Sequence, residues 1–186
     1  SLFDASTFPV QIAAEVKQFD PDQSRIPESV RMLAGRSTLL CLEAAAAAIA
    51  DSGIDMSREA PERIGVSVGS DEEYLHFAKT EEIYDRAHVY QAFAEGQDAY
   101  IELLRRSSAL ARAWSFRKKA DMASQFLCVA NNIQGPVQAS HTACSSSGHA
   151  IGAAKRFIES GDCDIAVAGG NCSMLSEFSV AGFHLL

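Results

Sequence analysis

The segment Thr142–Ser147 places a cysteine among small residues, directly between a stretch that predicts a strand and one that predicts a helix. Residues 137–141 have the extended pattern, and residues 148–154 are mostly glycine and alanine at helical spacing. A strand that turns at once into a helix sets Cys144 at the helix N-terminus, where unpaired amides and the macrodipole favour a thiolate. The sequence therefore predicts a nucleophile elbow built around a cysteine.

Three other stretches carry strand patterns. Apolar residues alternate over residues 10–16, which predicts a strand with one buried face. Small and branched residues predict further strands over residues 63–69 and 164–168, both short enough for a buried sheet.

Helices are expected between these strands. Helical spacing predicts them over residues 37–50 and 121–132, and from the elbow through residue 158. Ser37 is the expected N-cap of the first helix, and Gly161 supplies a left-handed cap after the third. Strands and helices thus alternate along the chain, which indicates α/β layering.

The segment from residue 71 to residue 119 differs from the rest of the chain. It is charged and rich in glutamate, tyrosine, alanine and arginine, with an apolar stripe that includes Leu103, Leu104 and Trp114. We expect helices here, within a single domain that spans residues 1–186.

Composition argues against several classes of function. The formal net charge is −8 and no stripe of lysine and arginine occurs, so we expect no nucleic-acid partner. The longest apolar run, residues 44–50, is too short to cross a bilayer, and the chain opens without a basic leader, so we expect no membrane. Five cysteines lack any CxxC pair or cluster with histidine, which predicts no metal, no cofactor and a reduced, cytoplasmic compartment.

Several of these segments follow one another in the order found in one family. They are Phe8–Val16, Gln134–Pro136, the Thr-Ala-Cys-Ser-Ser-Ser core, Gly161–Gly170 and Ser179–Phe183. In these motifs the chain resembles the β-ketoacyl synthases of fatty acid and polyketide synthesis. The resemblance implies the N-terminal half of a thiolase-like fold, with αβαβα layers, from which the first strand and the C-terminal half are absent. The family has a more compact connection in place of residues 71–119, so we expect a helical insertion there.

The resemblance also implies roles for particular residues. Cys144 would accept an acyl group from an acyl carrier protein, contribute its N–H to an oxyanion hole and lead to condensation with a malonyl unit. Phe183 would line the acyl pocket, the alternative being an ordinary core phenylalanine. The family's two catalytic histidines and its lysine come from the C-terminal half, so an incomplete active site is expected here. His141 and His149 stand at positions that the family does not use for catalysis.

The three serines after Cys144 are expected to cap helix amides and to shape the elbow. Arg117, Lys118 and Lys119 stand where the family has an apolar segment beside the acyl tunnel, which leaves the acyl substrate open.

Partners and alternative functions follow from the same resemblance. The expected partners are an acyl carrier protein, the C-terminal half of the synthase and a second synthase chain, identical or related, that pairs with residues 137–142. One alternative is a non-catalytic subunit that sets chain length or acts as a scaffold, against which the intact Cys144 argues. The other is a thiolase-type enzyme that acts on coenzyme A esters.

Overall fold

The structure, a computed structural model, describes residues 4–24, 26–70 and 121–185. The chain divides into two compact units. The described part of the larger unit comprises residues 18–24, 26–70 and 121–173, and that of the smaller unit comprises residues 4–17 and 174–185. The helical insertion expected over residues 71–119 lies outside the described residues.

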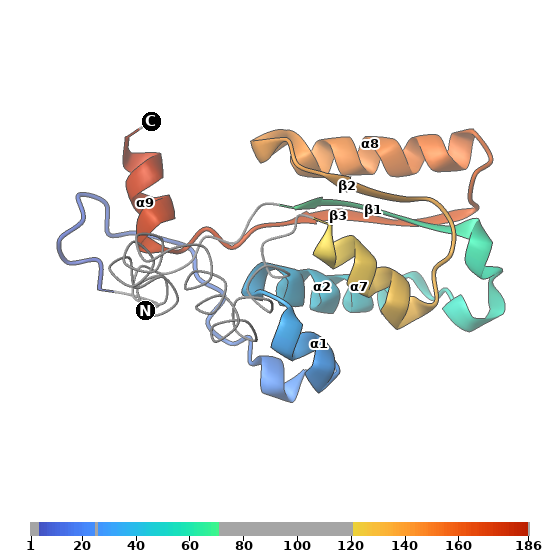
Figure 1. Cartoon of the computed structure of the whole chain (residues 1–186), viewed down its shortest axis with the longest axis horizontal. Helices are drawn as coiled ribbons and strands as arrows, with labels where there is room; N and C mark the ends of the chain where they lie inside the picture. Colours follow the sequence, from blue (N-terminus) through green and yellow to red (C-terminus); the bar gives the residue numbers. More distant parts are fainter. Residues whose placement is uncertain (1–3, 25, 71–120, 186) are drawn as a thin grey trace, which may run out of the picture. The chain divides into compact units, whose positions relative to one another are not determined.

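A parallel sheet of three strands forms the centre of the larger unit, in the order β2-β1-β3 (Figure 1). The central strand β1 (Ile64–Ser70) is buried along its whole length between β2 (Val137–Ser140) and β3 (Ile165–Asn171). Because all three strands are parallel, their carboxyl ends meet at one edge of the sheet. The elbow follows β2 at that edge.

Helices cover both faces of this sheet (Figure 1). One face is covered by α2 (Arg36–Ser52) and α7 (Met122–Asn131), and the other by α8 (Ser146–Glu159). A short helix, α1 (Glu28–Leu33), precedes α2 in the chain. Single turns of 3-10 helix complete the larger unit: η1 (Pro21–Gln23), η2 (Met56–Arg58), η3 (Pro61–Arg63) and η4 (Ala143–Ser145). The predicted α/β layering is confirmed.

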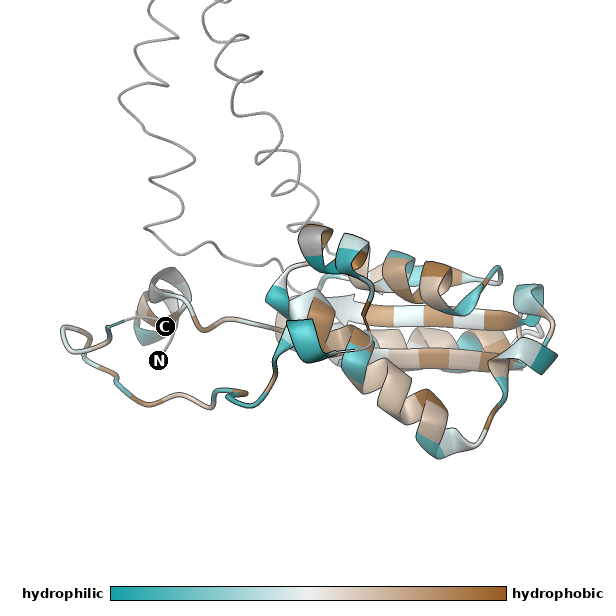
Figure 2. Cartoon of the chain, turned by 90° about the horizontal axis from the view of Figure 1, so that it is seen from below, coloured by the Kyte–Doolittle hydropathy of each residue, from teal (hydrophilic) through white to brown (hydrophobic). Residues whose placement is uncertain are grey.

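Side chains of two sizes alternate along β1, so its two faces pack differently. The branched side chains of β1 are buried with leucines of α2 and α7: Ile64, Val66, Val68, Leu39, Leu42 and Leu127. Figure 2 shows hydrophobic bands along the strands. The alternate positions, Gly65, Ser67 and Gly69, face the side covered by α8. This small-residue face lets α8 approach the sheet backbone closely.

Most expected elements are confirmed with shifted ends. The strands predicted over residues 63–69 and 164–168 are β1 and β3, and the three predicted helices are α2, α7 and α8. Gly161 has a φ of 78° and ends α8 as expected. The prediction of Ser37 as the N-cap of α2 is wrong, because Gly35 occupies that position. The Ser37 hydroxyl instead accepts a hydrogen bond from Asn171 Nδ2 at 2.6 Å.

The strand expected over residues 10–16 is wrong. This stretch forms no strand among the described residues, and Ile12 is 87% exposed. A strand is stable only when a neighbouring strand accepts and donates its hydrogen bonds. Alternation of apolar residues marks a face that could be buried, but it does not supply that neighbour.

The smaller unit contains one helix among its described residues, α9 (Glu177–His184). Ser176 caps this helix, since its Oγ accepts a hydrogen bond from the Ser179 N–H at 3.3 Å. Among residues 4–24, 26–70 and 121–185, no helix combines the length and apolarity needed to cross a bilayer.

An exposed ion pair joins the start of β1 to the loop before β3. Arg63 Nε donates to Asp164 Oδ2 at 2.9 Å, and Arg63 Nη1 donates to the Gly161 carbonyl at 2.6 Å. The hydrogen bond from Arg63 holds the pKa of the Asp164 carboxyl below its ordinary value of 3.8. A lowered carboxyl pKa stabilises the fold above the ordinary pKa, and this contribution disappears as pH falls through the lowered value.

We expect Asp164→Asn to lower the melting temperature near neutral pH but not in strong acid. The difference from wild type should persist down to the ordinary pKa of 3.8 and disappear as pH falls through the lowered value, because the wild-type carboxyl is then neutral, like the asparagine side chain. Thermal unfolding followed by circular dichroism over this pH range measures the difference. An Asp164 effect that is equal at all pH values would contradict the argument.

Candidate functional site

Cys144 lies in η4, the single turn of 3-10 helix that connects β2 to α8. Its side chain is exposed. Because α8 begins at Ser146, Cys144 lies directly before the N-terminus of that helix. The structure thus contains the strand–turn–helix elbow that the sequence predicts.

The residue before the thiol has a strained backbone. Ala143 has a φ of 50°, in the left-handed region that residues other than glycine seldom adopt. Such a conformation costs on the order of 1 kcal/mol or more and persists only where the surroundings hold it in place. Thr142, on the other side of Ala143, is hydrogen-bonded to the residues that follow the turn.

Every polar group of Thr142 has a partner on the turn or on α8. Its N–H donates to Ser146 Oγ at 2.7 Å, and its carbonyl accepts from Ser145 Oγ at 2.7 Å. Its Oγ1 lies 2.8 Å from His149 Nδ1. The expectation that the serines cap helix amides is therefore corrected: α8 has no side-chain cap at its N-terminus, and two of the serines bond back to Thr142.

Two strand glycines allow the start of α8 to rest on the sheet. A Cβ on Gly69 of β1 would collide with the Ser146 carbonyl carbon and would lie 2.6 Å from the Ser147 N atom. A Cβ on Gly170 of β3 would collide with the Ser147 side chain. The position of the elbow therefore depends on the absence of side chains at the ends of both strands.

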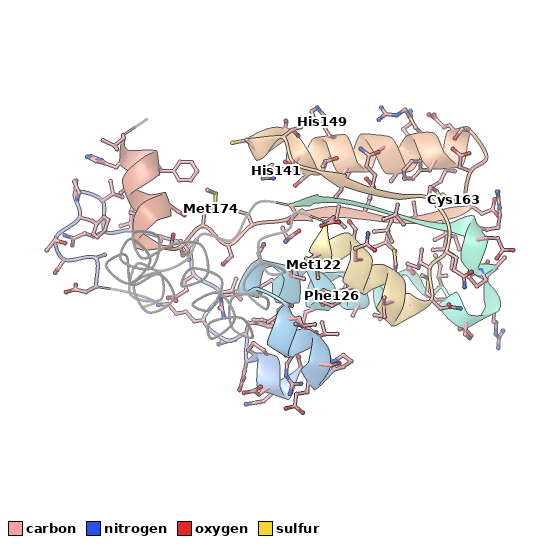
Figure 3. The ribbon with its side chains drawn as sticks, in the orientation of Figure 1. Met122, Phe126, His141, His149, Cys163 and Met174 are labelled. Atoms are coloured by element: carbon pink, nitrogen blue, oxygen red, sulfur yellow. The ribbon has the colours of Figure 1, made fainter. Side chains whose placement is uncertain are left out.

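Two histidines flank the elbow, at the end of α8 opposite Cys163 (Figure 3). His141 Nδ1 lies 3.0 Å from the Ser70 carbonyl oxygen at the end of β1, and His149 Nδ1 contacts Thr142. The structure therefore brings Cys144, His141 and His149 to one edge of the sheet. Phe183 lies on α9 in the smaller unit and is 56% exposed, and its role in an acyl pocket stays a prediction.

The five cysteines are free thiols of very different accessibility. Only Cys144 and Cys172 are exposed. Burial raises the pKa of Cys41 to about 11 and also raises the pKa values of Cys128 and Cys163, which makes these three thiols weak nucleophiles near neutral pH. The described residues contain no group of three or more side chains that could hold a metal ion.

The contact between His149 and Thr142 does not follow from any pattern that the sequence displays openly. It joins a residue at the end of a strand segment to one seven positions later on a helix. The available signal is helical spacing, because Ser145 and His149 are four residues apart and neighbouring side chains on a helix recur at that interval. That spacing places His149 above the turn without revealing that Thr142 reaches it.

Comparison with known proteins shows the family. The sequence model described as Beta-ketoacyl synthase, N-terminal domain, matches residues 4–186. The 3-oxoacyl-[acyl-carrier-protein] synthase 2 of Coxiella burnetii is 29% identical over 97% of this chain and 39% of its own length. The tetracenomycin polyketide synthase ketoacyl synthase alpha subunit of Streptomyces glaucescens is 28% identical over 100% of this chain and 41% of its own length. The chain thus spans about two fifths of the length of these relatives.

Solved ketosynthase structures show the same fold. The ishigamide ketosynthase/chain length factor superimposes with a TM-score of 0.70 over 98% of this chain and 41% of that chain, at 23% identity. The ketosynthase complex AntDE:AntF superimposes with a TM-score of 0.67 over 89% of this chain and 43% of that chain, at 16% identity. These likenesses confirm the thiolase-like fold class. With the family match extending over residues 4–186, this chain belongs to the β-ketoacyl synthases, whose N-terminal domain it matches.

Proposed function

We propose that this chain contributes the acyl-accepting thiol of a β-ketoacyl synthase. The Cys144 thiolate attacks the carbonyl of an acyl thioester on an acyl carrier protein, a new thioester forms on Cys144, and the carrier thiol leaves. The observation that carries this proposal is the exposed thiol on an elbow that is fixed at the N-terminus of α8. Two described relatives support the class of substrate, since one acts as an acyl-carrier-protein synthase by name and one as a polyketide ketoacyl synthase.

In the second step, a malonyl unit on the carrier protein loses carbon dioxide. The resulting carbanion attacks the acyl carbonyl on Cys144, a carbon–carbon bond forms, and the Cys144 thiolate leaves. We propose that the groups that promote decarboxylation come from a C-terminal half, as the resemblance to the family implies. The relatives, of which this chain spans about two fifths, have room for such a half.

The outer face of α8 supports this division of the active site. Ile151 and Ile158 are 57% and 47% exposed, and a Cβ on Gly148 or Gly152 would meet nothing within 4 Å. An amphipathic helix normally keeps such apolar residues away from water. We propose that the C-terminal half packs on this face, as the layered fold of the family implies.

The free edge of β2 supports a second synthase chain as partner. β2 is an edge strand of the described sheet, and Val137 on it is 43% exposed. Exposed edges of this kind invite pairing with another strand. We propose that β2 pairs antiparallel with its counterpart in an identical or related chain; the ishigamide structure, described as a ketosynthase with a chain length factor, supports such pairing.

Ala139→Pro is expected to halve the mass of the assembly. The Pro136 carbonyl accepts from the Val66 N–H at 2.9 Å, so alternation along β2 turns the Ala139 N–H outward, and proline removes that donor without touching the β1 ladder. Light scattering after gel filtration measures the mass, with far-UV circular dichroism as the control for folding. A folded variant that keeps the wild-type mass contradicts pairing through this edge.

The choice of acyl donor separates the proposed function from its rivals. We expect intact-mass spectrometry to show an acyl adduct after incubation with an acyl-carrier-protein thioester, and much less with the matching coenzyme A ester. An adduct from coenzyme A alone would instead support a thiolase-type enzyme, and no adduct from either donor would support a non-catalytic subunit. The five free thiols support a reducing compartment, and we propose the cytoplasm.

A further inference from the structure

We infer that Ser146 and His149 are positioning residues that hold the Cys144 thiol at the helix N-terminus by restraining Thr142. The inference rests on the proposed role of Cys144 as acyl acceptor. Neither side chain needs to touch the substrate. Both act on Thr142, which is two residues before the thiol and is separated from it by the strained Ala143.

Ser146 restrains the main chain of Thr142. Ser146 is only 6% exposed, and its Oγ accepts a hydrogen bond from the Thr142 N–H at 2.7 Å. The backbone of Ser146 in turn lies directly against Gly69, so this acceptor is fixed to the sheet. Removing the hydroxyl leaves the Thr142 N–H without its partner, which allows Ala143 to relax out of the left-handed region and to carry Cys144 away from the helix amides.

His149 restrains the side chain of Thr142. Its Nδ1 lies 2.8 Å from Thr142 Oγ1, and His149 belongs to the first turns of α8. Because the interacting atom is Nδ1, an asparagine can place a polar atom at the same distance from the backbone, whereas a glutamine places its polar atoms one bond further away. Asparagine and glutamine therefore form a matched pair that distinguishes this contact from a general need for a polar side chain.

The rate at which iodoacetamide alkylates each cysteine, followed by peptide mass spectrometry, tests the inference. The exposed Cys172 serves as an internal reference, and Cys163, which is 1% exposed, reports unfolding. We expect Ser146→Ala to slow alkylation of Cys144 about tenfold relative to Cys172, the effect of leaving a shielded donor unpaired. Ser147→Ala, which keeps the Cβ that packs on Gly170, should change the rate by less than about twofold.

The histidine pair gives the second comparison. We expect His149→Gln to slow alkylation of Cys144 about threefold and His149→Asn to restore the wild-type rate, with Cys163 unreactive in both. The inference would be overturned if Cys144 is alkylated at the same rate in His149→Gln and His149→Asn. It would also be overturned if the rates are equal in Ser146→Ala and Ser147→Ala while Cys163 stays unreactive. If Ser146→Ala unfolds, so that Cys163 reacts, the comparison of His149→Gln with His149→Asn tests the inference by itself, because His149 is exposed.

Alkylation needs no carrier protein, so the inference and the proposed function fail separately. A protein that shows the expected alkylation pattern but accepts no acyl group refutes the proposed function and leaves the positioning roles in place. A protein that loads an acyl group at the same rate in every variant, with an unchanged alkylation pattern, refutes the positioning roles alone.

Discussion

Replacing Cys144 by alanine is expected to abolish acyl loading from an acyl-carrier-protein thioester. Cys144 is an exposed thiol in the tight turn before α8, and a thiol is a better nucleophile near neutral pH than the serine hydroxyls of the same elbow. Two of the three serines after it, Ser145 and Ser146, are hydrogen-bonded to Thr142 and keep their hydroxyl protons. Intact-mass spectrometry should therefore show a full acyl adduct on the wild type and none on Cys144→Ala.

Cys172→Ala is the matched control, because Cys172 is the other exposed cysteine. It lies just after β3 and not at the start of a helix, so its removal should leave the adduct intact. An adduct that persists in Cys144→Ala and disappears in Cys172→Ala would transfer the acceptor role to the second thiol. Loss of the adduct in both variants would show that loading depends on the overall fold of this edge.

The elements that the sequence predicts correctly are those that form the sheet or pack against it. β1 and β3 consist of small and branched residues with turn signals on either side, and this composition is typical of buried parallel strands. α8 follows from the same logic, since its alanines at helical spacing pack on the small residues of the sheet. In such segments local pattern and tertiary packing favour the same structure.

The predictions that fail, or that no contact tests, concern features created by partners distant in the sequence. The alternation over residues 10–16 gives a strand pattern, but a strand requires a neighbour that the pattern does not encode. Ser37 has the chemistry of an N-cap, yet Asn171 from β3 engages its hydroxyl instead. The contacts of Thr142 with Ser146 and His149 likewise form only when β2, the turn and α8 come together. Sequence reasoning therefore identifies Cys144 but not the residues that we infer to position it.

Replacing Gly69 by alanine is expected to destabilise the fold strongly and to displace the elbow. The added Cβ would overlap the carbonyl carbon of Ser146 and lie 2.5 Å from its oxygen. Both are backbone atoms, so no side chain can rotate away, and α8 must lift from the sheet. Overpacking of this kind costs about 1–3 kcal/mol, and we expect a value near the upper end of that range in urea unfolding.

Gly152→Ala in the middle of α8 is the matched control. A Cβ at this position meets nothing within 4 Å, so the change adds a methyl group without a collision. Because alanine favours a helix over glycine by about 0.5–1 kcal/mol, this variant should be slightly more stable than the wild type. Cys144 lies in the turn directly before α8, so a shift of that helix also moves the thiol. Gly69→Ala should therefore slow alkylation of Cys144, whereas Gly152→Ala should not. A Gly69→Ala variant as stable as the wild type would mean that the elbow does not need close contact with β1, and that the helix N-terminus can be held by the contacts of Thr142 alone.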